Sequence, residues 1–112
     1  MIKVYNKLVR DKIPDFIMEN NQIADYTVLS DEDYLNELHN KLNEEIEEYQ
    51  KSREIEEMAD IFEVLQAVCA VCDFSMEKIF EIKNKKAAER GGFEKKIYLR
   101  TVENKKKDRT ID

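Results

Sequence analysis

The sequence predicts an all-α protein: a helical bundle with an extended N-terminal arm and an extended C-terminal tail. The chain has 112 residues with only two Gly and one Pro, so few residues interrupt helices. Apolar residues make up 42% of the chain, which is enough for one modest core, and they recur at helical spacing through its middle. We expect one domain over residues 1–103 and a disordered tail over residues 104–112.

The N-terminal part is expected to hold one short helix between two extended segments. Residues 1–13 form an irregular or extended arm, and Pro14 suits the first turn of a helix through PDFIMEN. The pair Asn20-Asn21 ends this helix. The β-branched and aromatic run IADYTVLS that follows fits either one short strand or an extended crossing.

Two long helices are expected next, with a reversal between them. Ser30 and Asp31 are N-cap candidates for a helix from about residue 32 to 50, and a second runs from about residue 53 to 72. A single straight helix would put positions 45 and 60 about 22 Å apart along its axis, too far to share an ion. We therefore predict a turn near Ser52.

A third long helix is predicted from Met76 to Arg90. Asp73 or Ser75 caps its start, and Gly91-Gly92 stops it. The segment FEKKIYLRTV that follows fits a short strand or an extended tail.

The charges are numerous and segregated. Charged residues make up 39% of the chain and the net charge is −6, which argues against a general nucleic-acid binder. Residues 31–63 carry thirteen acidic side chains against three basic ones, and residues 78–107 carry eleven basic side chains. The most apolar segment, residues 64–72, is far shorter than the about 20 residues that a membrane span needs. We expect a cytoplasmic protein with no membrane contact.

Carboxylates of the first two long helices border apolar surfaces. Glu45 and Glu48 are i,i+3 neighbours on the margin of the first helix's apolar stripe, which Lys41 shares. On the second helix, Glu57 and Asp60 lie on the same strip as a run of apolar residues. That run, the narrower apolar strip of the helix, consists of Val64, Ala67, Val68 and Val71. The main apolar face of the same helix is separate and consists of Ile55, Met58, Phe62, Leu65, Cys69 and Cys72.

Carboxylates in such places are costly unless they are paired, neutralised or bound to a metal. Four of them from two helices supply hard oxygen ligands, which select Mg²⁺ or Mn²⁺. A di-iron site would require Glu-x-x-His pairs, and the single histidine, His39, has Asn36 three residues before it. On the third helix, Lys83, Lys86 and Arg90 are either ordinary last-turn cations or, beside such a metal site, phosphate-binding residues.

The chain resembles the MazG-like, all-α NTP pyrophosphohydrolase superfamily. Its signature E-E-x-x-E followed by E-x-x-D is present at residues 44–48 and 57–60. YNKLVRDKIP at residues 5–14 and KKAAERGGFEK at residues 85–95 resemble the phosphoribosyl-ATP pyrophosphohydrolase-like branch. The resemblance spans about residues 1–103, although the two acidic motifs stand closer together than in many members.

The resemblance implies a Mg²⁺-dependent nucleotide pyrophosphohydrolase that forms dimers or tetramers. It would cleave a nucleoside triphosphate-type substrate, or a phosphoribosyl-ATP-like one, between the α and β phosphates. The implied metal ligands are Glu45, Glu48, Glu57 and Asp60. Glu44 is a supporting acid, and Glu44 and Glu45 are the candidate catalytic residues. The implied substrate-binding cations are Lys83, Lys86 and Arg90. Lys41 is added as a fourth candidate because it shares the margin of Glu45 and Glu48.

Two other functions fit the same residues. One is a non-catalytic nucleotide- or metal-binding module, and the other is a helical interaction protein whose acidic surface meets a basic partner. The arm residues Lys7, Arg10, Asp11 and Lys12 match the branch motif, and they fit an oligomer contact, a phosphate contact or a structural clamp.

Overall fold

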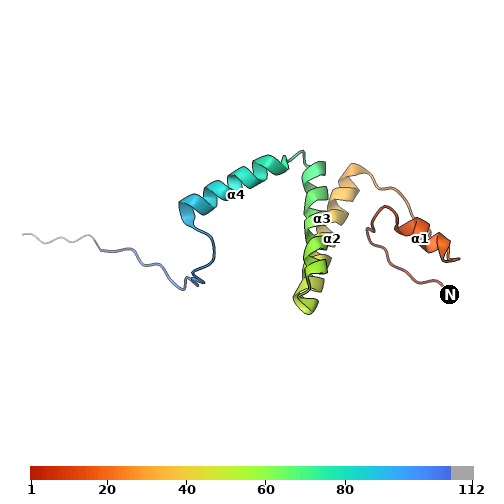
Figure 1. Ribbon diagram of the computed structural model, residues 1–112, viewed down its shortest axis with the longest axis horizontal. Coiled ribbons are helices and arrows are strands. Elements are labelled where there is room, and N and C mark those ends of the chain that lie inside the picture. Colours follow the sequence, from red (N-terminus) through yellow and green to blue (C-terminus); the bar gives the residue numbers. More distant parts are fainter. Residues whose placement is uncertain (107–112) are drawn as a thin grey trace, which may run out of the picture. The chain divides into compact units, whose positions relative to one another are not determined.

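The computed structural model of the chain describes residues 1–106 (Figure 1), and its regular elements there are all helices. They are α1 (Ile13–Glu19), α2 (Asp31–Ser52), α3 (Ile55–Val71) and α4 (Met76–Arg90). The all-α prediction is therefore confirmed for these residues. The strand alternatives for IADYTVLS and for FEKKIYLRTV are wrong, because neither run forms a ladder with another segment of the described chain.

The chain divides into two compact units, Met1–Ile79 and Phe80–Asp112. The first unit holds α1, α2, α3 and the start of α4. The second holds the rest of α4 and the segment after it. The expected single domain over residues 1–103 stays a prediction.

In the first unit, the arm over residues 1–12 has no regular secondary structure, and α1 follows with Pro14 in its first turn. The helix ends at Glu19 with Asn20 as its C-cap, and Asn21 takes a left-handed conformation with φ of 60°. Pro14 in the first turn and the end of the helix at the Asn20-Asn21 pair are both as predicted. The arm is nevertheless tied to the rest of the unit by ion pairs, described below with the site.

The two long helices meet at a sharp reversal. Ser30 caps α2 by accepting a hydrogen bond from the backbone N–H of Asp33 at 3.2 Å. Arg53 then adopts a left-handed conformation with φ of 56°, and its N–H donates to the carbonyl of Tyr49, which closes the helix. The predicted turn near Ser52 is therefore confirmed.

The antiparallel pair α2–α3, called the hairpin below, forms the packed centre of the first unit (Figure 1). In the described part of the chain, extensive packing between helices is confined to this pair. Leu38 of α2 and Val64 of α3 are the two apolar side chains buried there, at 3% and 8% exposure. Val64 belongs to the narrower apolar strip of α3, so this strip is the one that faces α2.

In the second unit, α4 ends at Arg90, and Gly91 continues with φ of +86°, a value that glycine adopts at little cost. The predicted bounds of this helix are confirmed. Residues 97–106 have no regular structure, and most of the predicted tail, residues 107–112, lies outside the described residues. Within residues 1–106, no helix is both long and apolar enough to cross a membrane.

Candidate metal site on the helix hairpin

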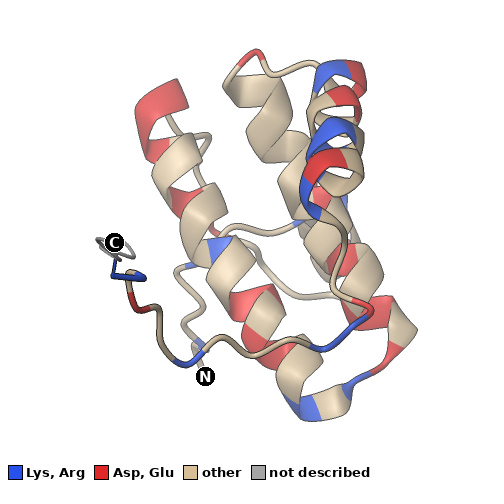
Figure 2. Cartoon of the chain, turned by 90° about the vertical axis from the view of Figure 1, so that its left-hand side faces the viewer, with Lys and Arg blue, Asp and Glu red and all other residues tan. Residues whose placement is uncertain are grey.

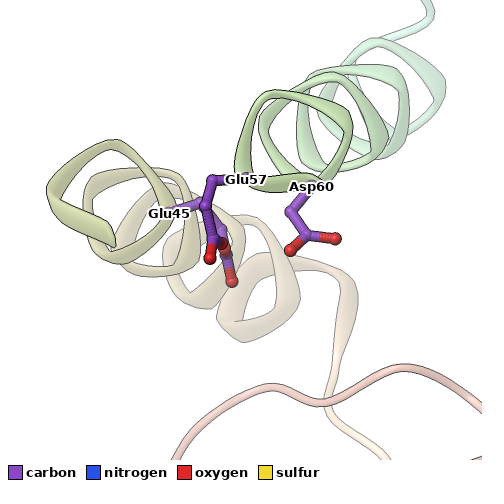
Figure 3. A group of neighbouring side chains, drawn as sticks. All are labelled: Glu45, Glu57 and Asp60. Carbon is purple, nitrogen blue, oxygen red and sulfur yellow. The ribbon is translucent and has the colours of Figure 1, made fainter. Parts of the chain in front are cut away.

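Three carboxylates converge where α2 and α3 pack together. Glu45 comes from α2, and Glu57 and Asp60 come from the first two turns of α3 (Figure 3). One oxygen of each lies within 4.8 Å of the others, a spacing at which all three can ligate one ion. The three side chains point to the same side of the helix pair. The reversal between the helices thus brings together three of the four predicted carboxylates, and Glu48 lies outside this group.

Helical periodicity explains the convergence. Glu45 follows the buried Leu38 by seven residues, two full turns, and so lies on the same inner face of α2. Glu57 and Asp60 precede the buried Val64 by seven and four residues, so they share the inner face of α3. Each inner face is therefore apolar toward one end and acidic toward the other. Figure 2 marks the acidic positions, which recur along both helices.

Glu45 is buried more deeply than its place on the margin of the stripe suggested. It is 8% exposed, and its Oε1 lies 3.3 Å from Nζ of Lys41, one turn earlier on α2. A carboxylate this deeply buried requires a cation, and Lys41 supplies one in this structure. Lys41 is itself largely covered and also lies 3.5 Å from Glu44.

Glu57 has a raised pKa. Partial burial is the main cause, and repulsion from Asp60, Glu48 and Glu45 adds to it. Like charges this close destabilise one another, and a bound cation would relieve the repulsion. The same crowding that raises the pKa therefore favours cation binding.

The N-terminal arm reaches the cluster with two cations. Arg10 Nη2 lies 2.8 Å from Asp60 Oδ1, and Lys7 Nζ lies 2.9 Å from Glu44 Oε1. The hydrogen bond from Lys7 lowers the pKa of Glu44, and the same bond raises the pKa of Lys7. Of the three roles that the sequence left open for the arm, these ion pairs fit the structural clamp. The opposite charges of the arm and of the two acidic motifs are the one sequence signal for this contact. Nothing else in the sequence places the arm against α2 and α3.

The other predicted site residues are distributed as follows. Glu48 is exposed and lies outside the group of three, so its role as a metal ligand stays a prediction. Glu44 is half-buried between Lys7 and Lys41, consistent with a supporting position. Asp11 and Lys12 are exposed on the arm.

The predicted phosphate-binding cations of α4 belong to the second unit, whereas the carboxylates belong to the first. Lys83, Lys86 and Arg90 are all exposed. Lys83 Nζ lies 5.9 Å from the ring centroid of Phe80 and 3.4 Å from Oδ1 of Asn84. Their contact with a substrate stays a prediction.

Oxygen donors alone make up the cluster, and such donors suit Mg²⁺, Mn²⁺ or Ca²⁺ rather than zinc or copper. Comparisons with protein-family models, with curated proteins and with solved structures found no match to this chain. The case for a function therefore depends on the site itself.

Proposed function

We propose that the protein is a Mg²⁺-dependent nucleotide pyrophosphohydrolase that converts a nucleoside triphosphate-type substrate to the monophosphate and pyrophosphate. The observation that carries this proposal is the meeting of Glu45, Glu57 and Asp60 from two helices, with ligand oxygens within 4.8 Å of one another. The acidic motifs that supply these residues, and their resemblance to the MazG-like superfamily, support the same reaction.

In this proposal, Glu45, Glu57 and Asp60 hold Mg²⁺, and Glu48 completes the set as the resemblance implies. Bound Mg²⁺ would neutralise the phosphate chain and lower the pKa of a bound water. Water attacks the α phosphorus, the bond from that phosphorus to the bridging oxygen breaks, and pyrophosphate leaves. Glu44, whose pKa is lowered, stays ionised and positions Lys7 and Lys41 beside the cluster.

The cations that pair with the acidic residues can also bind the phosphates of an anionic substrate. Arg10 has further N–H donors beyond the one that bonds Asp60, and guanidinium groups bind phosphate oxygens in pairs. We assign phosphate binding first to Arg10, Lys7 and Lys41, because these three already contact the acidic residues. Lys83, Lys86 and Arg90 are assigned to the departing pyrophosphate on the resemblance alone.

The assay that tests the function measures pyrophosphate release from a panel of canonical and modified nucleoside triphosphates with Mg²⁺. We expect Glu45→Gln and Asp60→Asn to reduce kcat/KM at least about 100-fold, since each removes a charged ligand of the ion. Glu47→Gln, a substitution on the exposed side of the same helix, should leave the rate unchanged.

Undiminished turnover in both site variants would remove these residues from the mechanism. Tight binding of nucleotide and Mg²⁺ by the wild type without turnover would indicate the non-catalytic module instead. A wild type that binds neither would contradict the proposed function altogether.

A further inference from the structure

The N-terminal arm contacts both helices of the hairpin at its acidic end. Lys7 Nζ lies 2.9 Å from Oε1 of Glu44 on α2, and Arg10 Nη2 lies 2.8 Å from Oδ1 of Asp60 on α3. The arm, α2 and α3 all belong to the first unit of the chain. Two cations of one short segment therefore bridge the two helices that supply the candidate metal ligands.

The backbone of the arm favours this bridge. Asn6 has a φ of 45°, in the left-handed region that asparagine adopts more readily than most residues, and the chain bends at Lys7. At the other end of the bridge, the carbonyl of Arg10 accepts a hydrogen bond from the N–H of Ile13 at 3.0 Å, in the turn that leads into α1. A bend and a turn thus fix the course of the arm on either side of the two cations.

Arg10 and a metal ion would compete for the same carboxylate. Asp60 is one of the three residues whose ligand oxygens lie within 4.8 Å of one another, and it is also the partner of Arg10. A divalent cation bound to the three carboxylates would draw the charge of Asp60 toward itself and would repel the guanidinium group. The ion pair of Arg10 is therefore stronger in the metal-free protein than in the metal-bound one.

We propose that the arm is a latch on the metal site: the ion pair between Arg10 and Asp60 opposes the binding of a divalent cation, and the bound cation releases Arg10. Lys7 pairs with Glu44, which is outside the group of three carboxylates, so it keeps the released arm beside the site. Such coupling is reciprocal, since each of the two events weakens the other by the same factor. The inference rests on the metal site of the proposed function and not on turnover.

Calorimetric titration with Mg²⁺ in the absence of nucleotide tests the latch. We expect Arg10→Ala to lower the Kd for Mg²⁺ about two- to fivefold, which is the modest effect of a partly exposed ion pair. Lys12→Ala is the matched control, because it removes the same charge from the same arm but Lys12 makes no ion pair within residues 1–106. Its Kd should equal that of the wild type.

The release of Arg10 has a direct readout in the NMR signal of its side-chain Nε–H group, which is assigned by its absence from Arg10→Ala. We expect Mg²⁺ to shift this signal in the wild type toward its position in Asp60→Asn, where the ion pair is missing. In Asp60→Asn itself, Mg²⁺ should leave the signal in place. Arg10→Ala should thus bind Mg²⁺ more tightly and yet turn over nucleotide more slowly if Arg10 also binds phosphate.

Three results would overturn the latch while leaving the proposed function intact. They are a Kd for Arg10→Ala equal to or above that of the wild type, an equal fall of the Kd in Lys12→Ala, and an Arg10 signal that Mg²⁺ does not shift. A wild type that binds Mg²⁺ with these properties but releases no pyrophosphate would contradict the proposed function and support the latch. A wild type that binds no Mg²⁺ would contradict both.

Discussion

Glu45, buried beside Lys41, shows how the hairpin accommodates a buried carboxylate. The ion pair at 3.3 Å compensates the buried charge. At the other side of the cluster, the exposed cations Arg10 and Lys7 neutralise Asp60 and Glu44. The cluster is thus neutralised by three cations from two segments, the arm and α2.

Replacement of Arg10 by Ala tests its role in substrate binding. We expect kcat/KM for the best nucleotide to fall about 10- to 100-fold, because a charge-assisted hydrogen bond contributes about 1.5–3 kcal/mol. Arg10→Lys should recover part of the loss. Lys12→Ala serves as the control, since Lys12 makes no ion pair within residues 1–106. Equal kcat/KM in wild type and Arg10→Ala would mean that Arg10 only holds the arm against α3 and does not bind the substrate.

The pair of Lys7 and Glu44 should give stability a defined pH dependence. Glu44 has a pKa below 4.5, so its contribution is complete above pH 4.5 and is lost as the pH falls through its folded-state value. Lys7 has a pKa above 10.5, so its contribution is complete below pH 10.5 and is lost as the pH rises through its folded-state value.

Urea unfolding of the wild type and Lys7→Ala over a pH series measures this effect. Between those limits we expect Lys7→Ala to lower the free energy of unfolding by less than about 1 kcal/mol, because the pair is partly exposed to solvent. The difference should disappear in acid. A difference that persisted unchanged to pH 2 would show that Lys7 stabilises the fold by contacts other than this ion pair.

At the level of elements, the turn between α2 and α3 determines whether the carboxylates meet. The turn depends on Arg53, whose φ of 56° costs an L-residue about 1–2 kcal/mol. Ser52 assists, since its Oγ accepts a hydrogen bond from the N–H of Glu54 at 3.3 Å. It acts in this way within the turn and is not the N-cap of α3, which is Glu54.

Substitution of Arg53 checks the turn. Arg53→Gly should raise the free energy of unfolding by up to about 1 kcal/mol, because glycine removes the left-handed strain but adds freedom to the unfolded chain. Arg53→Val should lower it, since a β-branched residue disfavours this conformation. Chemical denaturation measures both. Stabilities equal to the wild type in both variants would contradict a left-handed residue at this position.

For the whole molecule, Mg²⁺ should couple to folding, because the ligands come from two helices and meet only in the folded chain. At a concentration 100 times its Kd, a ligand stabilises the native state by about 2.7 kcal/mol. We therefore expect Mg²⁺ to raise the melting temperature of the wild type and of Glu47→Gln, but not of Asp60→Asn. A rise of the same size in Asp60→Asn would mean that Mg²⁺ binds elsewhere.

The sequence by itself determined the helices and the pairing of acidic positions. Helical periodicity and capping residues predicted α2, α3 and α4 to within about two residues, because these signals act locally. The same periodicity selected Glu45, Glu48, Glu57 and Asp60, of which all but Glu48 lie together in the structure. The strand alternatives failed because a strand depends on a partner that local sequence does not reveal.

Only the tertiary structure decided which surfaces meet. It placed the narrower strip of α3, and not its wider apolar face, against α2, and it brought Lys7 and Arg10 to Glu44 and Asp60 across 37 and 50 residues. Contacts between segments so distant depend on the path of the whole chain, which periodicity does not encode. For that reason the contacts of the arm's cations with Glu44 and Asp60 emerged only once the helices were packed.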